Sequence, residues 1–223
     1  ILFHTDAVQA FGQVPIDVDA LNIDMLSSSG HKLNGPKGIG FLYIRKGVKI
    51  RSFLHGGAQE RKRRAGTENV PGIVGFGKAV ELAVANMEER TGKEQELRDY
   101  LMDRVLKEVP FARVNGDRVR RLPNNVNFCF QFIEGESLLI MLDMKGICGS
   151  SGSACTSGSL DPSHVLLAIG LPHEIAHGSL RLTLGEDTTK EDIDYTVEAI
   201  KEIVGQLREM SPLYEDYMKK HGN

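Results

Sequence analysis

Ser27–Lys32 reads SSSGHK and continues into Leu33–Gly40 as LNGPKGIG, and this stretch decides how the rest of the chain is interpreted. Apolar runs at residues 23–26 and 39–44 flank it and predict two short buried strands. Small residues between them allow the backbone to approach a ligand closely, and hydroxyls with backbone amides suit a phosphate. A desolvated lysine at the end of such a turn can attack a carbonyl. On its own, however, such a stretch is more often a polar surface loop.

The composition is that of a soluble globular protein: 41% of the 223 residues are hydrophobic and 26% are charged. This length allows one large domain or two smaller ones. A net charge of -3 gives no general attraction to nucleic acid. No apolar run reaches the roughly 20 residues of a membrane span, and no signal peptide is visible, so we expect no membrane association. The chain opens on ILF without an initiator Met, and we expect a truncated or processed chain.

Three cysteines, Cys129, Cys148 and Cys155, have no metal-site spacing and are too few for a disulfide scaffold. We therefore expect no metal and a reducing, cytoplasmic location.

In the first part of the chain, residues 1–5 predict a strand that ends at Asp6, followed by a short helical segment at residues 7–11. Ligands gather at the carboxyl ends of strands in parallel α/β sheets, so Asp6 stands where a ligand would bind. An ordinary helix N-cap is the alternative role for Asp6. From residue 70 the pattern predicts a long helical stretch, broken or bent near Thr91 and Gly92.

Four consecutive basic residues at 61–64 raise the question of nucleic-acid binding. No aromatic residues interleave with them, and the acidic balance of the chain argues against such a role. An anion site or a solvated charge run is the more economical interpretation.

The second part alternates strands and helices, and we place the domain boundary at residue 85, giving domains 1–85 and 86–223. Strands are expected at 113–116, 125–132 and 179–184, and helices at 136–145 and 163–169. A Gly- and Ser-rich segment at 146–160 has Cys155 at its middle. Thr188 and Glu191 have capping-box spacing, which predicts the start of a final helix with an apolar face.

Five motifs occur together: TDAVQ at 5–9, SGHK at 29–32 with GPKG at 35–38, RAGT at 64–67, SSGSACTS at 150–157 and LRLTLG at 180–185. In their order and intervals they resemble the pyridoxal-phosphate-dependent cysteine desulfurases of the aminotransferase class V family. The resemblance covers the whole chain. It implies an α/β fold of the aminotransferase type (fold type I). The large domain would have a mixed, mostly parallel sheet, and a smaller α/β C-terminal domain would follow. By this resemblance, residues 1–85 are the C-terminal part of the cofactor-binding large domain, and 86–223 the small domain with the cysteine loop.

The resemblance also assigns the cofactor site. Lys32 matches the lysine that holds pyridoxal 5'-phosphate covalently and then moves protons at the substrate's α-carbon. Asp6 matches the carboxylate that pairs with the pyridinium nitrogen, and Gln9 the residue that hydrogen-bonds the ring's phenolic oxygen.

Further matches concern the phosphate and the substrate. Ser29 and His31 match phosphate ligands, and Thr67 matches a residue that reaches the phosphate on the other subunit, which implies a homodimer. Arg181 matches the arginine that binds the substrate carboxylate, a bidentate task suited to a guanidinium. Without the motif around it, a surface arginine at a strand edge would be the default.

Cys155 matches the nucleophile that takes sulfur from L-cysteine as a persulfide. Its Gly- and Ser-rich setting suits a thiolate that collects sulfur in one location and delivers it in another. Cys129 lies in an apolar run, and we interpret it and Cys148 as packing residues. In the family, about half of the large domain precedes Asp6 and carries a ring-stacking histidine and an asparagine, so this chain has part of the cofactor cradle.

The sequence therefore predicts a cysteine desulfurase, or its C-terminal portion, that converts L-cysteine to L-alanine. The resemblance suggests iron–sulfur cluster assembly as the pathway, with a scaffold protein as the sulfur acceptor. Nitrogen fixation is one process that such a scaffold could serve. One alternative is another enzyme of the same fold, a selenocysteine lyase or an aminotransferase. The second is a non-catalytic fragment that acts as a binding module.

Overall fold

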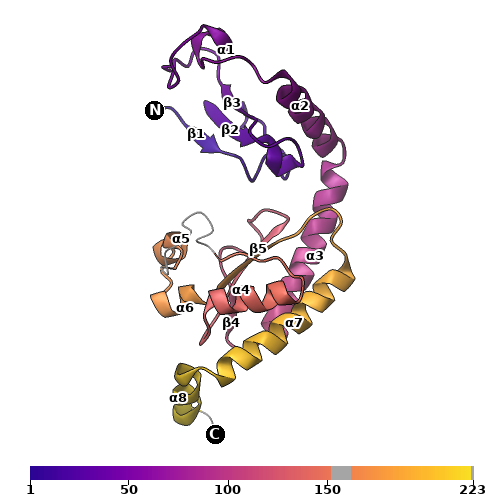
Figure 1. Cartoon of the computed structure of the whole chain (residues 1–223), viewed down its shortest axis with the longest axis vertical. Coiled ribbons are helices and arrows are strands. Elements are labelled where there is room, and N and C mark those ends of the chain that lie inside the picture. Colours follow the sequence, from indigo (N-terminus) through magenta and orange to yellow (C-terminus); the bar gives the residue numbers. More distant parts are fainter. Residues whose placement is uncertain (152–161, 222–223) are drawn as a thin grey trace. The chain divides into compact units, whose positions relative to one another are not determined.

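The computed structural model describes residues 1–151 and 162–221. It divides into two compact units, Ile1–Glu89 and Arg90–Asn223 (Figure 1). No helix among the described residues is long and apolar enough to cross a membrane.

Unit 1 contains a three-stranded sheet with the order β1-β2-β3, formed by β1 (His4–Asp6), β2 (Met25–Ser29) and β3 (Gly40–Ile44). β1 and β2 are parallel, whereas β2 and β3 are antiparallel, so the predicted mixed sheet is confirmed. β2 begins and ends later than the apolar run that predicted it. Its polar end stays in the strand because Ser27, Ser28 and Ser29 all pair with β3.

The helical segment predicted at residues 7–11 is wrong, because the chain forms turns there. Two helix-like hydrogen bonds form, from the Phe11 N–H to the Ala7 carbonyl at 2.8 Å and from the Val14 N–H to the Ala10 carbonyl at 3.1 Å. Gly12 then adopts a left-handed φ of 79°, which a continuing helix does not allow. The turn buries Ala7 beside Ile23 and Leu26 in a small core cluster.

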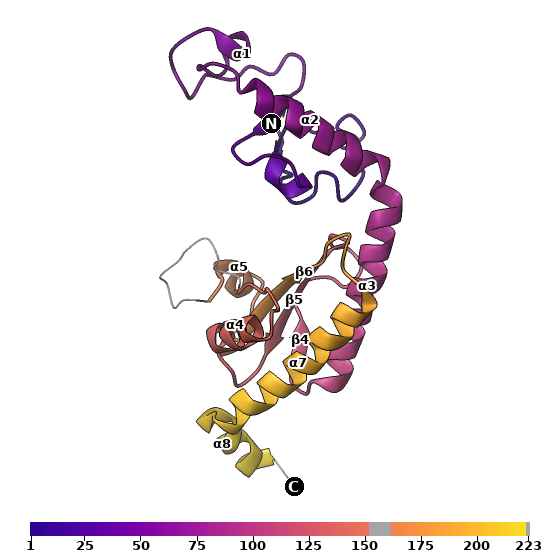
Figure 2. The same cartoon turned by 45° about the vertical axis from the view of Figure 1, so that its right-hand side comes forward.

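The helical elements of unit 1 are η1 (Gly30–Leu33), the short α1 (Gln59–Lys62) and α2 (Val70–Ala85). Asn69 caps α2 by accepting a hydrogen bond from the Gly72 N–H at 3.2 Å. Phe76 and Ala79 of α2 form a core cluster with Leu33 of η1, so the two elements pack against each other (α2 is labelled in Figure 2). The turn that carries Lys32 is therefore packed onto a helix.

The long helical stretch breaks at Asn86, after which α3 (Met87–Glu108) begins, so the break predicted near Thr91 and Gly92 is wrong. The helix continues through Gly92, and Glu94 in the next turn is its first buried residue. Glu94 is 2% exposed and pairs with Arg90 at 3.2 Å. Burial raises the pKa of Glu94, and the charge of Arg90 opposes that rise.

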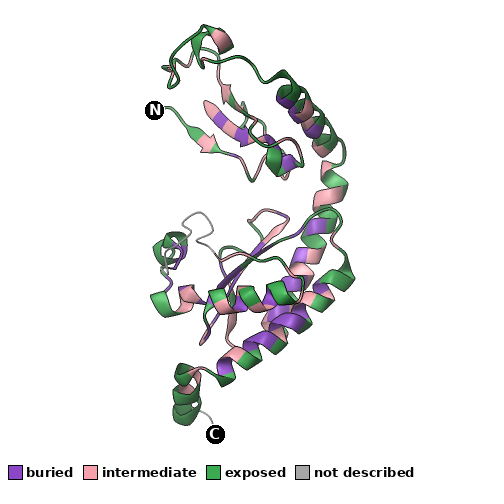
Figure 3. Cartoon of the chain, in the orientation of Figure 1, coloured by how far each residue is buried: buried purple, intermediate pink, exposed green. Residues whose placement is uncertain are grey.

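Unit 2 is built on an antiparallel sheet with the order β4-β5-β6, formed by β4 (Ala112–Val114), β5 (Asn125–Phe130) and β6 (Ser179–Thr183). Its apolar face carries Val126, Phe128, Leu180 and Leu182, which belong to the main core cluster with residues of α3. Figure 3 shows buried residues in purple along this sheet and along α3. The alternation of apolar and polar residues along β5 and β6 therefore has the period of two that the sequence indicates.

The remaining helices are α4 (Gly135–Met144), α5 (His164–Ala168), α6 (His173–His177), α7 (Lys190–Glu209) and α8 (Pro212–His221). The capping box of α7 is formed by Thr189 and Asp192, one position later than predicted. Thr188 does not cap because its hydroxyl accepts a hydrogen bond from the Gly185 N–H at 3.0 Å. α8 has no buried residue and is attached through the ring of Tyr217, which lies 5.3 Å from Phe111 and 5.1 Å from Phe132.

Candidate active site

Asp6 lies at the same edge of the unit 1 sheet as residues 30–35, the lysine turn, which carries Lys32. β1 and β2 are adjacent and parallel, and Asp6 is the register partner of Ser27. Both strands end at this edge, and η1 with Lys32 follows directly after β2. Two residues 26 positions apart in the sequence are thus brought to neighbouring strand ends.

The Asp6 carboxylate is held by its own turn. One oxygen, Oδ1, accepts a hydrogen bond from the Val8 N–H at 2.9 Å. No described residue donates to the other oxygen, Oδ2, and the side chain is exposed. The carboxylate is therefore oriented and keeps one oxygen for a ligand.

Leu33 holds the lysine turn in place, because its side chain is buried against Phe76 and Ala79 of α2. A Cβ on Gly35 would lie 2.9 Å from the Gly30 carbonyl oxygen and 3.0 Å from Cβ of Ala79. These small residues serve the packing of the turn onto the helix, whereas the sequence suggested that they bring the backbone close to a ligand. The consequence is that His31 and Lys32 are both exposed.

Ser29 and His31, the two predicted phosphate ligands, lie beside each other. Ser29 Oγ and His31 Nδ1 are 2.7 Å apart, a hydrogen bond across the start of η1. Gln9 lies in the turn after β1, and Thr67 lies in the irregular segment before α2. Both of these side chains are exposed.

Arg181 belongs to unit 2, where it occupies the middle of β6 with an exposed side chain. Its neighbour in β5 is Asn127. On its other side the backbone pairs with Ser150, through Ser150 N–H to Arg181 O at 3.0 Å and Arg181 N–H to Ser150 O at 2.6 Å. The segment that leads to the cysteine loop is thus attached to the strand that carries Arg181. Asn127 is not among the residues predicted from the sequence, although the alternation in β5 identifies the face on which it lies.

The cysteines differ in environment. Cys129 is fully buried in β5, and burial raises the pKa of its thiol, opposed by a hydrogen bond from Asn115. A buried, protonated thiol is unsuited to nucleophilic attack. Cys148 is exposed, so its interpretation as a packing residue is wrong. Cys155 lies outside the described residues.

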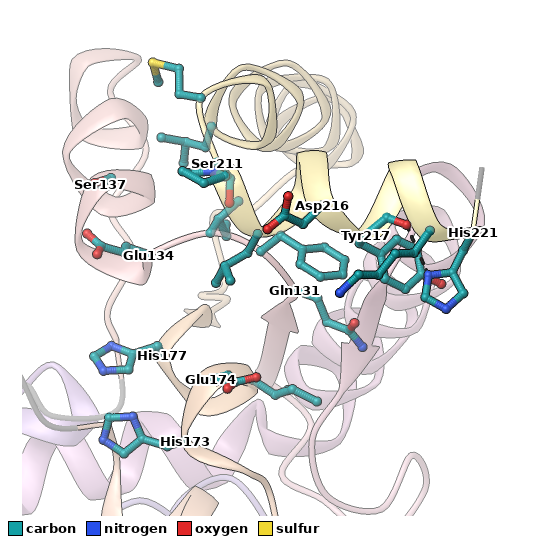
Figure 4. A pocket seen from close by; sticks show the side chains of 18 residues that line it. Gln131, Glu134, Ser137, His173, Glu174, His177, Ser211, Asp216, Tyr217 and His221 are labelled. Carbon is teal, nitrogen blue, oxygen red and sulfur yellow. Dashed lines mark hydrogen bonds between the residues drawn. The ribbon is translucent and has the colours of Figure 1, made fainter.

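A cavity of about 800 Å³ lies within unit 2, between the end of β5, α6 and α8 (Figure 4). Acidic Glu134, Glu174 and Asp216 line it together with His173 and His177. None of the residues predicted from the sequence as site residues lines this cavity.

The donor set in unit 1 fits a phosphorylated pyridine aldehyde. An amine, a carboxylate with one oxygen available, a hydroxyl and an imidazole lie at or directly after the ends of two adjacent parallel strands. The hydroxyl and imidazole suit a phosphate, the carboxylate a ring nitrogen, and the amine an aldehyde carbon.

Comparisons with known proteins agree with this geometry. The family model described as aminotransferase class-V matches residues 1–196. A cysteine desulfurase IscS of Clostridium botulinum (strain Hall) is 62% identical over 221 residues, which are 98% of this chain and 56% of that protein. An IscS of Methanosarcina thermophila is 64% identical over 213 residues, covering 96% of this chain and 52% of that protein. The chain therefore spans about half the length of the curated relatives it matches.

Solved structures give the same result. A NifS-like protein superposes with a TM-score of 0.82 at 39% identity, covering 92% of this chain and 53% of that one. A protein described as SspA in complex with cysteine matches with a TM-score of 0.64 at 35% identity, covering 85% of this chain and 52% of that one.

Proposed function

The chain belongs to the aminotransferase class-V family, and from this premise we propose that it is the C-terminal portion of a pyridoxal-phosphate-dependent cysteine desulfurase. The reaction converts L-cysteine and a protein thiol to L-alanine and a protein persulfide. Relatives that are 62% and 64% identical bear the name cysteine desulfurase IscS, and this similarity supports the reaction class.

One structural observation carries the proposal: Asp6 and Lys32 follow the ends of two adjacent parallel strands. Pyridine nitrogen and aldehyde carbon belong to one small molecule, so their protein partners must lie near each other. A carboxylate and an amine at neighbouring strand ends meet that requirement.

The residues that would hold pyridoxal phosphate are Lys32, Asp6, Ser29, His31 and Gln9. When bound, this cofactor supplies the electron sink for bond changes at the substrate's α- and β-carbons. In our proposal Lys32 anchors the cofactor and carries a proton at the α-carbon. Asp6 keeps the ring nitrogen protonated through charge pairing, and Ser29 and His31 donate to the phosphate.

For the substrate we propose that Arg181 binds the carboxylate of L-cysteine and that Cys155 attacks its sulfur. The new S–S bond forms as the carbon–sulfur bond breaks, and the carbon product gains a proton to become L-alanine. The structural relative described as being in complex with cysteine supports cysteine as the substrate. An aminotransferase would form a keto acid and would need no thiol.

Thr67 is proposed to reach the phosphate on a second subunit, which makes the protein a homodimer. An iron–sulfur scaffold protein is the proposed sulfur acceptor, and the cytoplasm is the proposed location. We also propose that residues 1–85 are part of the large domain and that 86–223 form the small domain.

A non-catalytic binding module is the second candidate, because the chain spans only 52–56% of the relatives' length. To separate the two, pyridoxal phosphate is added to this chain and to the same chain joined to the N-terminal half of the Clostridium botulinum relative. Borohydride reduction with peptide mass mapping reports attachment at Lys32, and amino-acid analysis reports L-alanine.

Attachment at Lys32 with L-alanine and persulfide as products supports the desulfurase. A keto acid would indicate an aminotransferase. Attachment without turnover in the joined protein would favour the binding module. Absence of Lys32 attachment in both proteins would overturn the cofactor site.

A further inference from the structure

On the face of the unit 2 sheet opposite the main core, Cys129 packs into a second apolar cluster, and beside it a row of polar side chains crosses the sheet at Arg181. Asn127 of β5 is the direct antiparallel partner of Arg181. Ser150 pairs with Arg181 from the other edge. Asn115, just after β4, donates its backbone N–H to the Asn127 carbonyl at 2.8 Å. Because paired residues share a face, the four side chains Asn115, Asn127, Arg181 and Ser150 form one polar row.

Asn127 is held in one orientation within this row. Its side-chain oxygen Oδ1 accepts a hydrogen bond from Asn115 Nδ2 at 2.6 Å. Asn115 is itself fixed, because it is 4% exposed and its Nδ2 also reaches the Sγ of buried Cys129 at 3.1 Å. With Oδ1 directed at Asn115, the amide nitrogen of Asn127 lies on the other side of the planar amide. No described residue accepts a hydrogen bond from it.

The orientation of the Asn115 side chain costs folding free energy that packing does not explain. Asn115 Oδ1 is buried and accepts no hydrogen bond from the described residues. An unsatisfied buried acceptor costs about 1–3 kcal/mol of folding free energy. A buried polar group kept at such a cost calls for a role beyond packing. Orienting Asn127 is a role that fits the contacts.

We propose that Asn127 is a substrate-binding residue, which donates from its amide nitrogen to the same carboxylate that Arg181 binds. This inference rests on the proposed function, because it deepens the site assigned to Arg181. Directly opposed residues in antiparallel strands have Cβ atoms about 5 Å apart, so both side chains can reach one carboxylate. A neutral amide adds a directional donor beside the guanidinium without adding charge repulsion. Asn115 is a positioning residue that acts through Asn127.

The test compares three variants of the pyridoxal-phosphate-loaded joined protein: Asn127→Ala, Asn127→Asp and the control Asn125→Ala. Asn125 is the matched control because it lies on the same strand and face, opposite Thr183 rather than Arg181. The readouts are KM for L-cysteine and the inhibition constants of L-alanine and L-alaninamide, which lacks the carboxylate. Borohydride trapping at Lys32 checks that the cofactor is bound equally.

Asn127→Ala should weaken inhibition by L-alanine about ten-fold, the loss of one hydrogen bond to a charged group, and leave L-alaninamide unchanged. Asn127→Asp should weaken inhibition by L-alanine about a hundred-fold, because the new carboxylate pairs with Arg181 and repels the carboxylate of the ligand. Asn125→Ala should change neither constant. Equal losses for L-alanine and L-alaninamide, or no loss in Asn127→Ala, would overturn the inference.

A second measurement keeps this inference separate from the proposed function. The side-chain amide resonance of Asn127 in the 223-residue chain is followed by NMR during titration with L-alanine and with L-alaninamide. A shift with L-alanine but not with L-alaninamide supports carboxylate binding near Asn127. This conclusion holds even if the protein forms no L-alanine, a result that would contradict the desulfurase proposal. No shift with L-alanine would overturn the role of Asn127.

Discussion

Asp6 and Ser27 are register partners in the parallel pair of β1 and β2, and the lysine turn begins three residues after Ser27. This pairing brings a carboxylate and an amine to one sheet edge, and it gives the first prediction a structural basis.

Lys32→Ala should abolish both covalent attachment of pyridoxal phosphate and formation of L-alanine, because the amine is the proposed anchor and proton carrier. Lys37→Ala is the matched control, since Lys37 is also an exposed lysine shortly after the same strand. Mass mapping after borohydride reduction measures the attachment. Near-normal turnover of Lys32→Ala would remove Lys32 from the chemistry.

Arg181→Lys should raise KM for L-cysteine by roughly ten-fold, because an ammonium cannot form the paired hydrogen bonds of a guanidinium with a carboxylate. Arg113→Lys provides the control, as Arg113 is exposed on the same sheet, opposite Cys129. Steady-state kinetics on the cofactor-loaded protein measure the change. An unaltered KM would argue that Arg181 is a surface residue.

Much of the fold follows from local pattern. The period-two alternation of Val126 and Phe128 predicts β5, and the apolar spacing of Ile193, Val197 and Ile200 predicts α7, and both are present. Boundaries are less predictable, because several residues compete for one role. Thr188 and Thr189 each have an acidic residue three positions later, and the turn hydrogen bond from Gly185 decides between them.

Features that depend on tertiary contacts escape such patterns. Glu94 is a buried charged residue of α3, which hydrophobic periodicity does not identify. α8 was not predicted either, although Pro212 at its first position is a helix-start signal. In the candidate site, the motifs name Asp6 and Lys32, but the proposed role of Asn127 depends on its register with Arg181.

Gly35→Ala should destabilise the protein by about 1–3 kcal/mol, because the added methyl group meets the Gly30 carbonyl and Ala79. Gly77→Ala is the control: a Cβ there would meet nothing within 4 Å apart from the backbone of α2 itself, so it should stabilise the helix by about 0.5–1 kcal/mol. Urea unfolding measures both. Equal stability of the two variants would contradict the tight packing of the lysine turn.

Acid should weaken the ion pairs of Glu108 with Arg104 and Lys201, the second of which joins α3 to α7. Hydrogen bonds from Arg104 and Lys201 lower the pKa of Glu108 to about 2, against about 4.3 in an unfolded chain. A carboxyl group whose pKa is lowered by folding contributes stability above the unfolded value, and loses it as pH falls through the folded value. We therefore expect unfolding free energy to fall between about pH 4.3 and pH 2.

Glu108→Gln should remove part of this pH dependence, since the amide does not titrate. Glu209→Gln, at an exposed glutamate ending α7, is the control and should leave the dependence intact. Urea unfolding across this pH range measures the free energy of unfolding. If that free energy changes equally with pH in wild type and Glu108→Gln, the role given to the Glu108 ion pairs is contradicted.

The last prediction concerns which cysteine carries sulfur. Cys155→Ser should still take up pyridoxal phosphate and bind L-cysteine, but it should form no persulfide and release almost no sulfide. Cys148→Ser is the sharpest control, because Cys148 is exposed and lies only seven positions before Cys155 in the sequence. Cys129→Ser should keep activity with reduced stability, since its thiol is buried and receives a hydrogen bond from Asn115. Alkylation of the persulfide followed by mass mapping identifies the modified residue. A persulfide on Cys148, with Cys155→Ser active, would reverse the assignment of the nucleophile.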